Sequence, residues 1–262
     1  MKVVIFCGGL GTRLREYSDN IPKPLVPIGY RPILWHVMMY YSHFGHKDFI
    51  LCLGYKADMI KEYFLNYNEY TTNDFIMSDG GKKIQLLNTD AHDWRITFVD
   101  TGINSNIGKR LKLVEPFLEG EEYFLANYSD GLSDMPLNAQ IDFFKKSGKT
   151  GCFMCARPSQ TFHIVKMNGE MLVDEIQYVR NADIWINAGY YVFRKDIFRH
   201  INMGEELVEE PFHRLIAQKE LVAYRYDKFW AMDTFKEQQE LSDMYTQGKA
   251  PWEVWKHAQD IR

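Results

Sequence analysis

Residues 2–25, KVVIFCGGLGTRLREYSDNIPKPL, join a short apolar run to a glycine-rich loop. The β-branched residues of this run predict a buried strand at 2–6. Directly after it, Gly8, Gly9 and Gly11 permit close backbone approach, and successive amide N–H groups in such a turn form a concavity that favours phosphate oxygens. Arg13 can add a two-pronged contact to the same anion. We therefore predict a strand that ends in an anion-binding loop.

Lys23 stands between two prolines that restrict the backbone, so its ammonium group is presented from a stiff segment. A solvated loop lysine is the alternative, and it leaves this stiffness unexplained. The loop before it matches neither of two common phosphate-binding loops. Its GGxG followed by Thr12 and Arg13 differs from the GxGxxG of dinucleotide-binding folds, and it lacks the Gly-Lys-Ser/Thr of a P-loop. We expect Lys23 to act on the bound anion.

The rest of the chain alternates strand patterns with amphipathic helix patterns, which indicates βαβ crossovers. The predicted fold is a single α/β domain, a mostly parallel mixed sheet flanked by helices in a Rossmann-like arrangement. Its ligand site is expected beyond the carboxyl ends of the strands. A hairpin over 162–179 should turn at Asn168-Gly169. Strands are predicted at 2–6, 48–55, 95–102, 122–131, 151–157 and 221–233, and helices at 32–45, 57–67, 109–118, 137–148, 209–218 and 237–248.

The composition is that of an ordinary globular protein, and the net charge of −4 gives no general attraction to nucleic acid or anionic lipid. Because of this charge, we expect no nucleic-acid partner. No apolar run reaches membrane-spanning length, so we expect no membrane partner either. The low cysteine content and the absence of a leader pattern favour the cytoplasm. Cys152 and Cys155 form a CxxC, but three positions apart in a strand they face opposite sides and suit the core.

Two segments, GGLGTRL at 8–14 and IPKPLVPIGYRPIL at 21–34, resemble the signature of the sugar-phosphate nucleotidylyltransferases, which join a nucleoside triphosphate to a sugar 1-phosphate. The resemblance extends over nearly the whole chain. The downstream segments are similar to those of glucose-1-phosphate cytidylyltransferases: GYKADMIKEYF at 54–64, VDTG at 99–102, GKRLKLV at 108–114, SDG at 129–131, MDT at 232–234 and GKAPWEVW at 248–255.

The resemblance implies a cytidylyltransferase of one domain over 1–262, with a nucleotide-binding half at about 1–135 and an acceptor-binding half at about 136–262. Nucleotidyl transfer needs charge neutralisation and alignment more than an acid or base. Mg²⁺ is the expected cofactor, because hard oxygen ligands suit it. Arg13 and Lys23 are the implied catalytic residues, and Asp130 and Asp233 the implied metal ligands. The implied nucleotide-binding residues are Gly8, Gly9, Gly11, Thr12, Gly108, Lys109 and Arg110.

The acceptor half departs from the family. Gln177, Tyr178 and Val179 stand where the family has Glu-Lys-Pro, and His163 follows Phe162 where the family has a glycine. Arg180 is a candidate substitute for the missing lysine, although guanidinium and ammonium groups are not interchangeable. His163 and Tyr178 could equally be packed strand residues. The expected acceptor-binding residues are His163, Tyr178, Arg180 and Asn187.

We expect the substrates to be CTP and a phosphorylated small molecule, either a sugar 1-phosphate such as glucose 1-phosphate or a divergent phosphorylated metabolite. Sequence alone leaves UTP and a thymidine nucleotide open. Two rival functions are a catalytically silent nucleotide-binding regulatory subunit and a glycosyltransferase that holds a finished nucleotide sugar. Aromatic-rich stretches such as YNEYTTNDF, at 67–75, make a homo-oligomer plausible.

Overall fold

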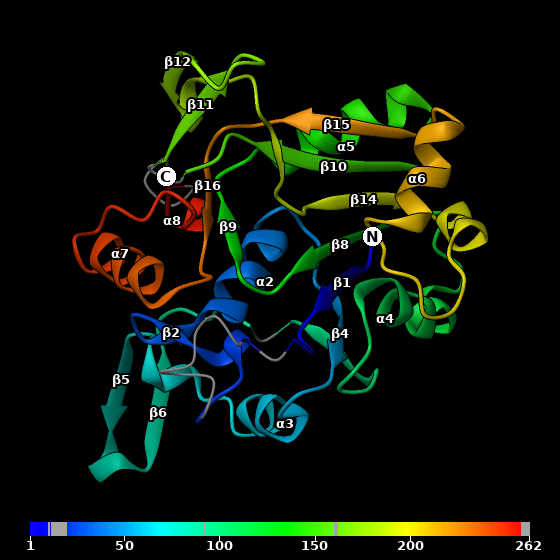
Figure 1. The fold of residues 1–262 in the computed structure, drawn as a ribbon. Coiled ribbons are helices and arrows are strands. Elements are labelled where there is room, and N and C mark those ends of the chain that lie inside the picture. The colour runs from blue at the N-terminus through cyan, green and yellow to red at the C-terminus, as the bar shows by residue number, and fades with distance from the viewer. Residues whose placement is uncertain (10, 12–19, 92, 160–161, 258–262) are drawn as a thin grey trace.

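The computed structural model describes residues 1–9, 11, 20–91, 93–159 and 162–257. Thr12 and Arg13 therefore lie outside the described residues. At the centre is an eight-stranded sheet in the order β13-β10-β14-β8-β1-β4-β7, with β15 beside β10 (Figure 1). The strands are β1 (Val3–Phe6), β4 (Asp48–Leu53), β7 (Arg95–Asp100), β8 (Tyr123–Tyr128), β10 (Gly151–Ala156), β13 (Ile186–Asn187), β14 (Tyr191–Arg194) and β15 (Leu221–Arg225).

The half of the sheet that carries β1 is parallel, since β1 pairs in parallel with β4 and β8, and β4 with β7. The other half is mixed: β14 runs antiparallel to β8 and β10, whereas β15 is parallel to β10. The expected mostly parallel mixed sheet is confirmed. Its carboxyl edge lies where β1, β4, β7 and β8 end together, which is the edge where α/β proteins bind ligands.

Helices cover both faces of the sheet. Side chains of β1 alternate: Val3 and Ile5 pack on one core with α2 and α5, while Val4 and Phe6 pack on a second core with α4 and α6. The α-helices are α2 (Ile33–His43), α3 (Ala57–Leu65), α4 (Ile107–Val114), α5 (Leu137–Ser147), α6 (Glu210–Ala217), α7 (Phe235–Thr246) and α8 (Val254–His257). The 3-10 helices are η2 (Lys23–Leu25), η3 (Glu69–Thr71), η4 (Asp79–Gly81), η5 (Glu115–Leu118), η6 (Val179–Asn181) and η7 (Lys195–His200).

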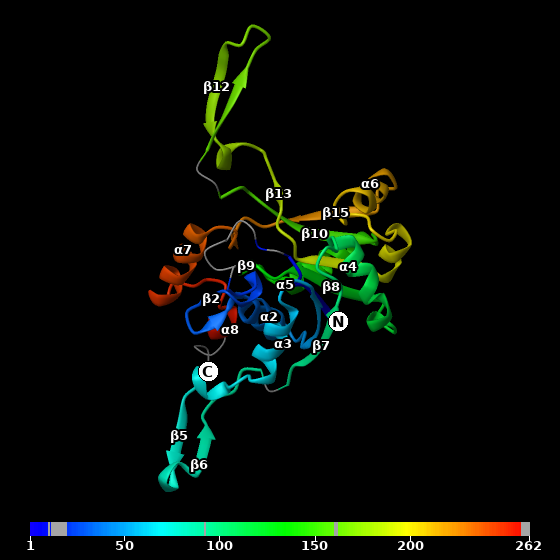
Figure 2. The same ribbon diagram turned by 60° about the horizontal axis from the view of Figure 1, so that its bottom comes forward.

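Two hairpins project from the body on opposite sides (Figure 2). The first, β5 (Phe75–Ser78) with β6 (Lys83–Leu86), was not predicted from the sequence. The second, β11 (His163–Met167) with β12 (Val173–Tyr178), confirms the predicted hairpin. The Asn168 side chain accepts the backbone N–H groups of Glu170 and Leu172 and so holds the turn.

The run at 221–233 was predicted as one strand, and this is wrong. After β15 the chain leaves the central sheet and forms β16 (Phe229–Ala231), which pairs antiparallel with β9 (Gly131–Ser133). Tertiary pairing decides the break, because the β-rich composition is equally suited to one strand or two. A further two-residue ribbon joins β2 (Pro27–Ile28) to β3 (Arg31–Pro32).

All four cysteines are buried free thiols, so Cys152 and Cys155 are core residues of β10 as expected. Within the described part of the chain, no helix has the length and apolar character needed to span a membrane.

Candidate active site

Lys23 lies between two carboxylates at the carboxyl edge of the sheet. Its Nζ donates to Asp130 Oδ2 at 2.5 Å and to Asp233 Oδ1 at 2.7 Å. The Lys23 side chain is only 12% exposed. Burial opposes its charged form, but the two carboxylates outweigh that effect and raise the pKa of Lys23 above its ordinary value. The ammonium group therefore remains charged at neutral pH.

The pairing of β9 with β16 brings the two aspartates together. Ala231 is opposite Gly131, and the backbone N–H of Met232 donates to the carbonyl of Asp130. Asp233 then lies just before α7, where the Glu237 carboxylate accepts its backbone N–H at 2.8 Å. Glu237 and Thr234 also form a capping box at the start of α7. The strand pairing and the start of α7 thus set the backbone positions of both aspartates.

The Arg110 side chain donates a hydrogen bond to the start of the glycine loop. The resemblance implies that Arg110 binds nucleotide; in this structure the residue is 2% exposed, and its guanidinium donates to the carbonyls of Gly8 and Leu53 and to Thr101 Oγ1. Burial lowers the pKa of Arg110 from its ordinary value. A Cβ on Gly8 would lie 2.0 Å from Arg110 Nη1, so any side chain at this position would displace the guanidinium from its hydrogen bonds. The buried carbonyls of Gly8 and Leu53 need hydrogen-bond donors, which explains why the guanidinium bonds to them.

A cavity of about 180 Å³ opens between the glycine loop, Lys23 and the first turn of α4. It brings together several predicted residues and others that sequence reasoning missed. Tyr128 directly precedes the Ser-Asp-Gly motif and Asn106 caps α4, so the local sequence could have indicated both as site residues. Glu206 lies far along the chain, and no local pattern indicates that it belongs to the site. The lining includes the predicted Gly8, Gly9, Gly11, Lys23, Arg110 and Asp130, and the missed Ser105, Asn106, Tyr128 and Glu206.

Gly108 and Lys109 do not line this cavity. Gly108 packs against a neighbouring segment, since a Cβ there would lie 2.2 Å from the carbonyl oxygen of Glu205. The half-buried Lys109 donates its backbone N–H to the Asn106 side chain. In this structure the two residues thus belong to the packing and capping of α4.

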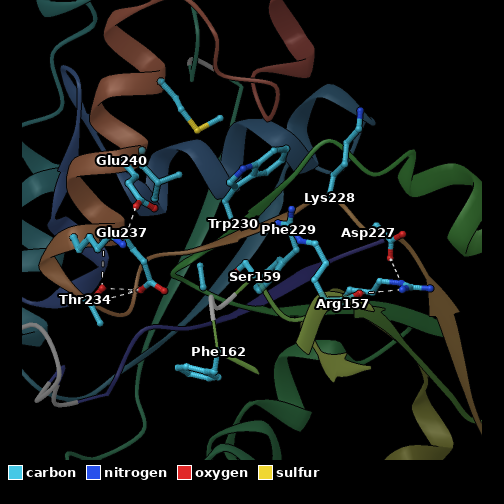
Figure 3. A pocket seen from close by; sticks show the side chains of 15 residues that line it. Arg157, Ser159, Phe162, Asp227, Lys228, Phe229, Trp230, Thr234, Glu237 and Glu240 are labelled. Carbon is cyan, nitrogen blue, oxygen red and sulfur yellow. Dashed lines mark hydrogen bonds and ion pairs between the residues drawn. The ribbon is translucent and has the colours of Figure 1, made fainter. Parts of the chain in front are cut away.

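A second cavity, of about 680 Å³, borders Thr234, the residue after Asp233. Figure 3 shows Arg157 and Phe162 on one side of this cavity, and Glu237 at the start of α7 on the other. Of the four predicted acceptor-binding residues, only Arg180 lines it.

The other three acceptor residues lie elsewhere. His163 and Tyr178 are opposite each other at the base of the β11–β12 hairpin, and their exposed rings pack with centroids 4.1 Å apart. Asn187 Nδ2 donates to Tyr191 Oη at 2.8 Å, and that hydroxyl donates to Tyr128 Oη at 3.0 Å. Asn187 is thereby linked to the smaller cavity through two tyrosines, with Tyr128 at its wall.

A mixed, mostly parallel sheet with an anion-suited loop and a Lys–Asp–Asp cluster at its carboxyl edge defines an α/β nucleotidyltransferase fold. The sequence profile of the family described as Nucleotidyl transferase matches residues 2–239. This chain therefore belongs to the nucleotidyl transferase family. The family resemblance found in the sequence is confirmed.

Two relatives are similar over nearly their full length. Glucose-1-phosphate cytidylyltransferase of Salmonella typhimurium (strain LT2) is 38% identical over 258 residues, covering 97% of this chain and 100% of the relative. A Bacillus subtilis (strain 168) protein named "Probable glucose-1-phosphate cytidylyltransferase" is 36% identical with the same coverage. The solved structure of UDP-glucose pyrophosphorylase complexed with UDP-glucose has a TM-score of 0.68 at 16% identity, covering 94% of this chain and 98% of that one, which shows the shared fold.

Proposed function

We propose that this protein joins CTP to a sugar 1-phosphate, giving a CDP-linked sugar and pyrophosphate. The observation that carries the proposal is the charged Lys23 held by Asp130 and Asp233 beside the glycine-loop cavity. The full-length similarity to glucose-1-phosphate cytidylyltransferases supports the choice of nucleotide and acceptor. In such a reaction the acceptor phosphate oxygen attacks the α-phosphorus in line and pyrophosphate leaves, so the protein must align the groups and stabilise charge.

Lys23 would stabilise the phosphate under attack, and the backbone amides at Gly8, Gly9 and Gly11 would hold the triphosphate. Asp130 and Asp233 would hold Mg²⁺. They fit this role because both carboxylates reach a single Nζ, and are thus close enough to share one cation. Among the described residues no group of three or more His, Cys, Asp or Glu gathers as a metal site. Mg²⁺ often binds through one or two carboxylates plus substrate phosphates, and when bound it neutralises phosphate charge.

The larger cavity would receive the acceptor, with Arg180 as the anchor for its phosphate. Three other cations of this cavity are already balanced by carboxylates: Arg157 by Asp227, Lys228 by Asp134 and Lys236 by Glu240. Within the described parts of the chain, the exposed Arg180 has no carboxylate partner. A guanidinium without a carboxylate partner, in the cavity that Thr234 also lines, is suited to a phosphate oxygen pair. Arg180 would then replace the family lysine, whose place Tyr178 occupies.

The proposal includes a cytoplasmic location and self-association. Four free buried thiols suit a reducing compartment. Both hairpins carry exposed apolar side chains, which is typical of interaction surfaces. These side chains are Phe75, Ile76, Met77 and Ile84 on the first hairpin, and Val165, Met167, Met171, Leu172, Val173 and Ile176 on the second.

The decisive experiment is pyrophosphate release with Mg²⁺ and each nucleoside triphosphate, against a panel of acceptors that includes glucose 1-phosphate. Release with CTP and a sugar 1-phosphate is the expected result. Release with CTP only when the acceptor is a phosphorylated compound other than a sugar 1-phosphate would mean that the acceptor pocket has a changed substrate specificity. Binding of CTP and Mg²⁺ without release for any acceptor would instead favour the silent regulatory subunit. CDP-glucose with pyrophosphate should regenerate CTP, which a glycosyltransferase cannot do.

A further inference from the structure

Glu206 places a carboxylate in the wall of a cavity that otherwise suits an anion. It lies in the segment between η7 and α6, and it lines the smaller cavity together with Gly8, Lys23 and Arg110. Its Oε2 accepts the backbone N–H of Ile107 at 3.3 Å, and its Oε1 accepts that of Leu207 at 3.0 Å. The carboxylate is thus attached to the first turn of α4.

The segment that carries Glu206 is held firmly against α4. Asn106 Nδ2 donates to the carbonyl of Gly204 at 2.7 Å. Gly108 leaves room for the Glu205 carbonyl, which a side chain would displace. Arg214 donates to both carboxylate oxygens of Glu205. The position of the Glu206 carboxylate is therefore set by the packing around it before any ligand binds.

Glu206 has no cationic partner within salt-bridge distance among the described residues, whereas Asp130 in the same cavity is paired with Lys23. An uncompensated carboxylate repels the phosphates of a nucleotide. It must therefore face a part of the ligand that carries hydrogen-bond donors and no negative charge. An ionised carboxylate only accepts hydrogen bonds. In a nucleotide, the ribose hydroxyls and the donors on the base meet this requirement, and the amino group of cytosine is the donor that distinguishes CTP from UTP.

We propose that Glu206 selects cytosine by accepting a hydrogen bond from its 4-amino group. The inference rests on the proposed cytidylyltransferase function and deepens it. Glu and Asp accept well from cytosine N4, while uracil and thymine present the O4 acceptor at the same place. A carboxylate facing O4 would lose its partner and meet a second acceptor. The Lys23 cluster would then face the phosphates, and the α4 turn with Glu206 would face the base.

Glu206→Gln tests this assignment, because the amide keeps one acceptor oxygen and adds donors that suit O4. The ratio of kcat/KM for CTP to that for UTP should fall by about 10- to 100-fold, the range expected for a hydrogen bond to a charged group. Glu209→Gln is the matched control, since it removes an exposed carboxylate from the same segment. An unchanged ratio in folded Glu206→Gln, as in the control, would overturn the proposal.

A second measurement uses the unaltered protein and does not require turnover. Calorimetric binding of CTP is compared with that of the matching triphosphate of pyrimidin-2-one, which lacks the 4-amino group. The analogue should bind to wild type about 10-fold or more weakly than CTP, and this difference should be smaller for Glu206→Gln, whose remaining acceptor is uncharged. Equal binding of the two by wild type overturns the inference. If no acceptor releases pyrophosphate, the proposed function fails while this comparison still decides the base contact.

Discussion

Arg110 Nη2 donates a 2.9 Å hydrogen bond to the carbonyl oxygen of Gly8, joining α4 to the glycine loop. The same guanidinium reaches Leu53 at the end of β4 and Thr101 directly after β7. One buried side chain thus ties together the carboxyl ends of three neighbouring parallel strands. This side chain therefore helps to hold Gly8, the first glycine of the loop, in place.

Replacing Arg110 with Lys should destabilise the fold, because an ammonium group cannot supply the planar fork of donors that these acceptors use. Buried acceptors left without a donor cost about 1–3 kcal/mol each, so we expect a loss of about 2–4 kcal/mol in the free energy of unfolding. Urea denaturation measures this change in the free energy of unfolding. Lys109→Ala, at the half-buried neighbouring position, should stay within about 0.5 kcal/mol of wild type. Equal stability of Arg110→Lys and wild type would show that the fork is dispensable.

The sequence predicted the parts of the site that depend on local chemistry. The glycine loop after β1, the proline-framed Lys23 and the aspartate of a post-strand turn all lie at the carboxyl edge of the sheet. That Asp130 and Asp233 meet at one ammonium depends on the pairing of β9 with β16. The run at 221–233 looked like a single strand because composition does not mark where a chain changes sheets.

Tertiary packing determined what the sequence could not predict. The resemblance implies that Arg110 binds nucleotide, yet three neighbouring chain segments supply carbonyl and hydroxyl acceptors that bind its guanidinium in the core. Glu206 reaches the cavity from a segment about a hundred residues after α4 begins, and no local pattern marks it. The predicted roles of Thr12 and Arg13 stay predictions, because both residues lie outside the described ranges.

Lys23→Met should lower kcat by about 10²- to 10³-fold, the usual cost of losing a preorganised group that stabilises transition-state charge. Two carboxylates would then face each other without the ammonium group between them. Repulsion between them should lower the Tm without metal, and added Mg²⁺ should raise the Tm of this variant more than that of wild type. Steady-state kinetics and thermal melts with and without MgCl₂ measure both effects.

Lys249→Met is the control for Lys23→Met, because Lys249 is an exposed lysine outside both cavities. It should leave kcat and the response to Mg²⁺ unchanged. Normal turnover of Lys23→Met would remove Lys23 from the mechanism. An identical Mg²⁺ response in Lys23→Met and wild type would remove the two aspartates as metal ligands.

Arg180→Ala should raise the KM for the phosphorylated acceptor by about 10- to 100-fold and leave the KM for CTP nearly unchanged, since the residue lines only the larger cavity. Arg180→Lys should recover part of the loss, because it restores charge without the fork. Arg95→Ala, an exposed arginine at the edge strand β7, is the control. A change confined to the KM for CTP would place Arg180 on the nucleotide side instead.

Glu205 should make stability depend on pH. Its hydrogen bonds from Arg214, with further bonds from Asn202, lower the pKa of Glu205 from 4.5 to about 2. Because the folded-state pKa is the lower one, this stabilisation is fully present above pH 4.5 and is lost as the pH falls toward 2. The Tm of wild type should therefore fall more steeply between pH 5 and pH 2 than that of Glu205→Gln, which lacks this carboxylate at every pH.

Glu209→Gln, an exposed position on the same segment, should keep the wild-type slope of Tm against pH. The slope of Glu205→Gln should be shallower, and the two variants should differ most near neutral pH, where the Glu205–Arg214 contact is complete. Parallel curves for Glu205→Gln and wild type would mean that this contact adds nothing to stability. Because Glu205 directly precedes Glu206, amide hydrogen exchange at Ile107 and Leu207 should also quicken in Glu205→Gln if the contact holds the carboxylate of Glu206 against α4.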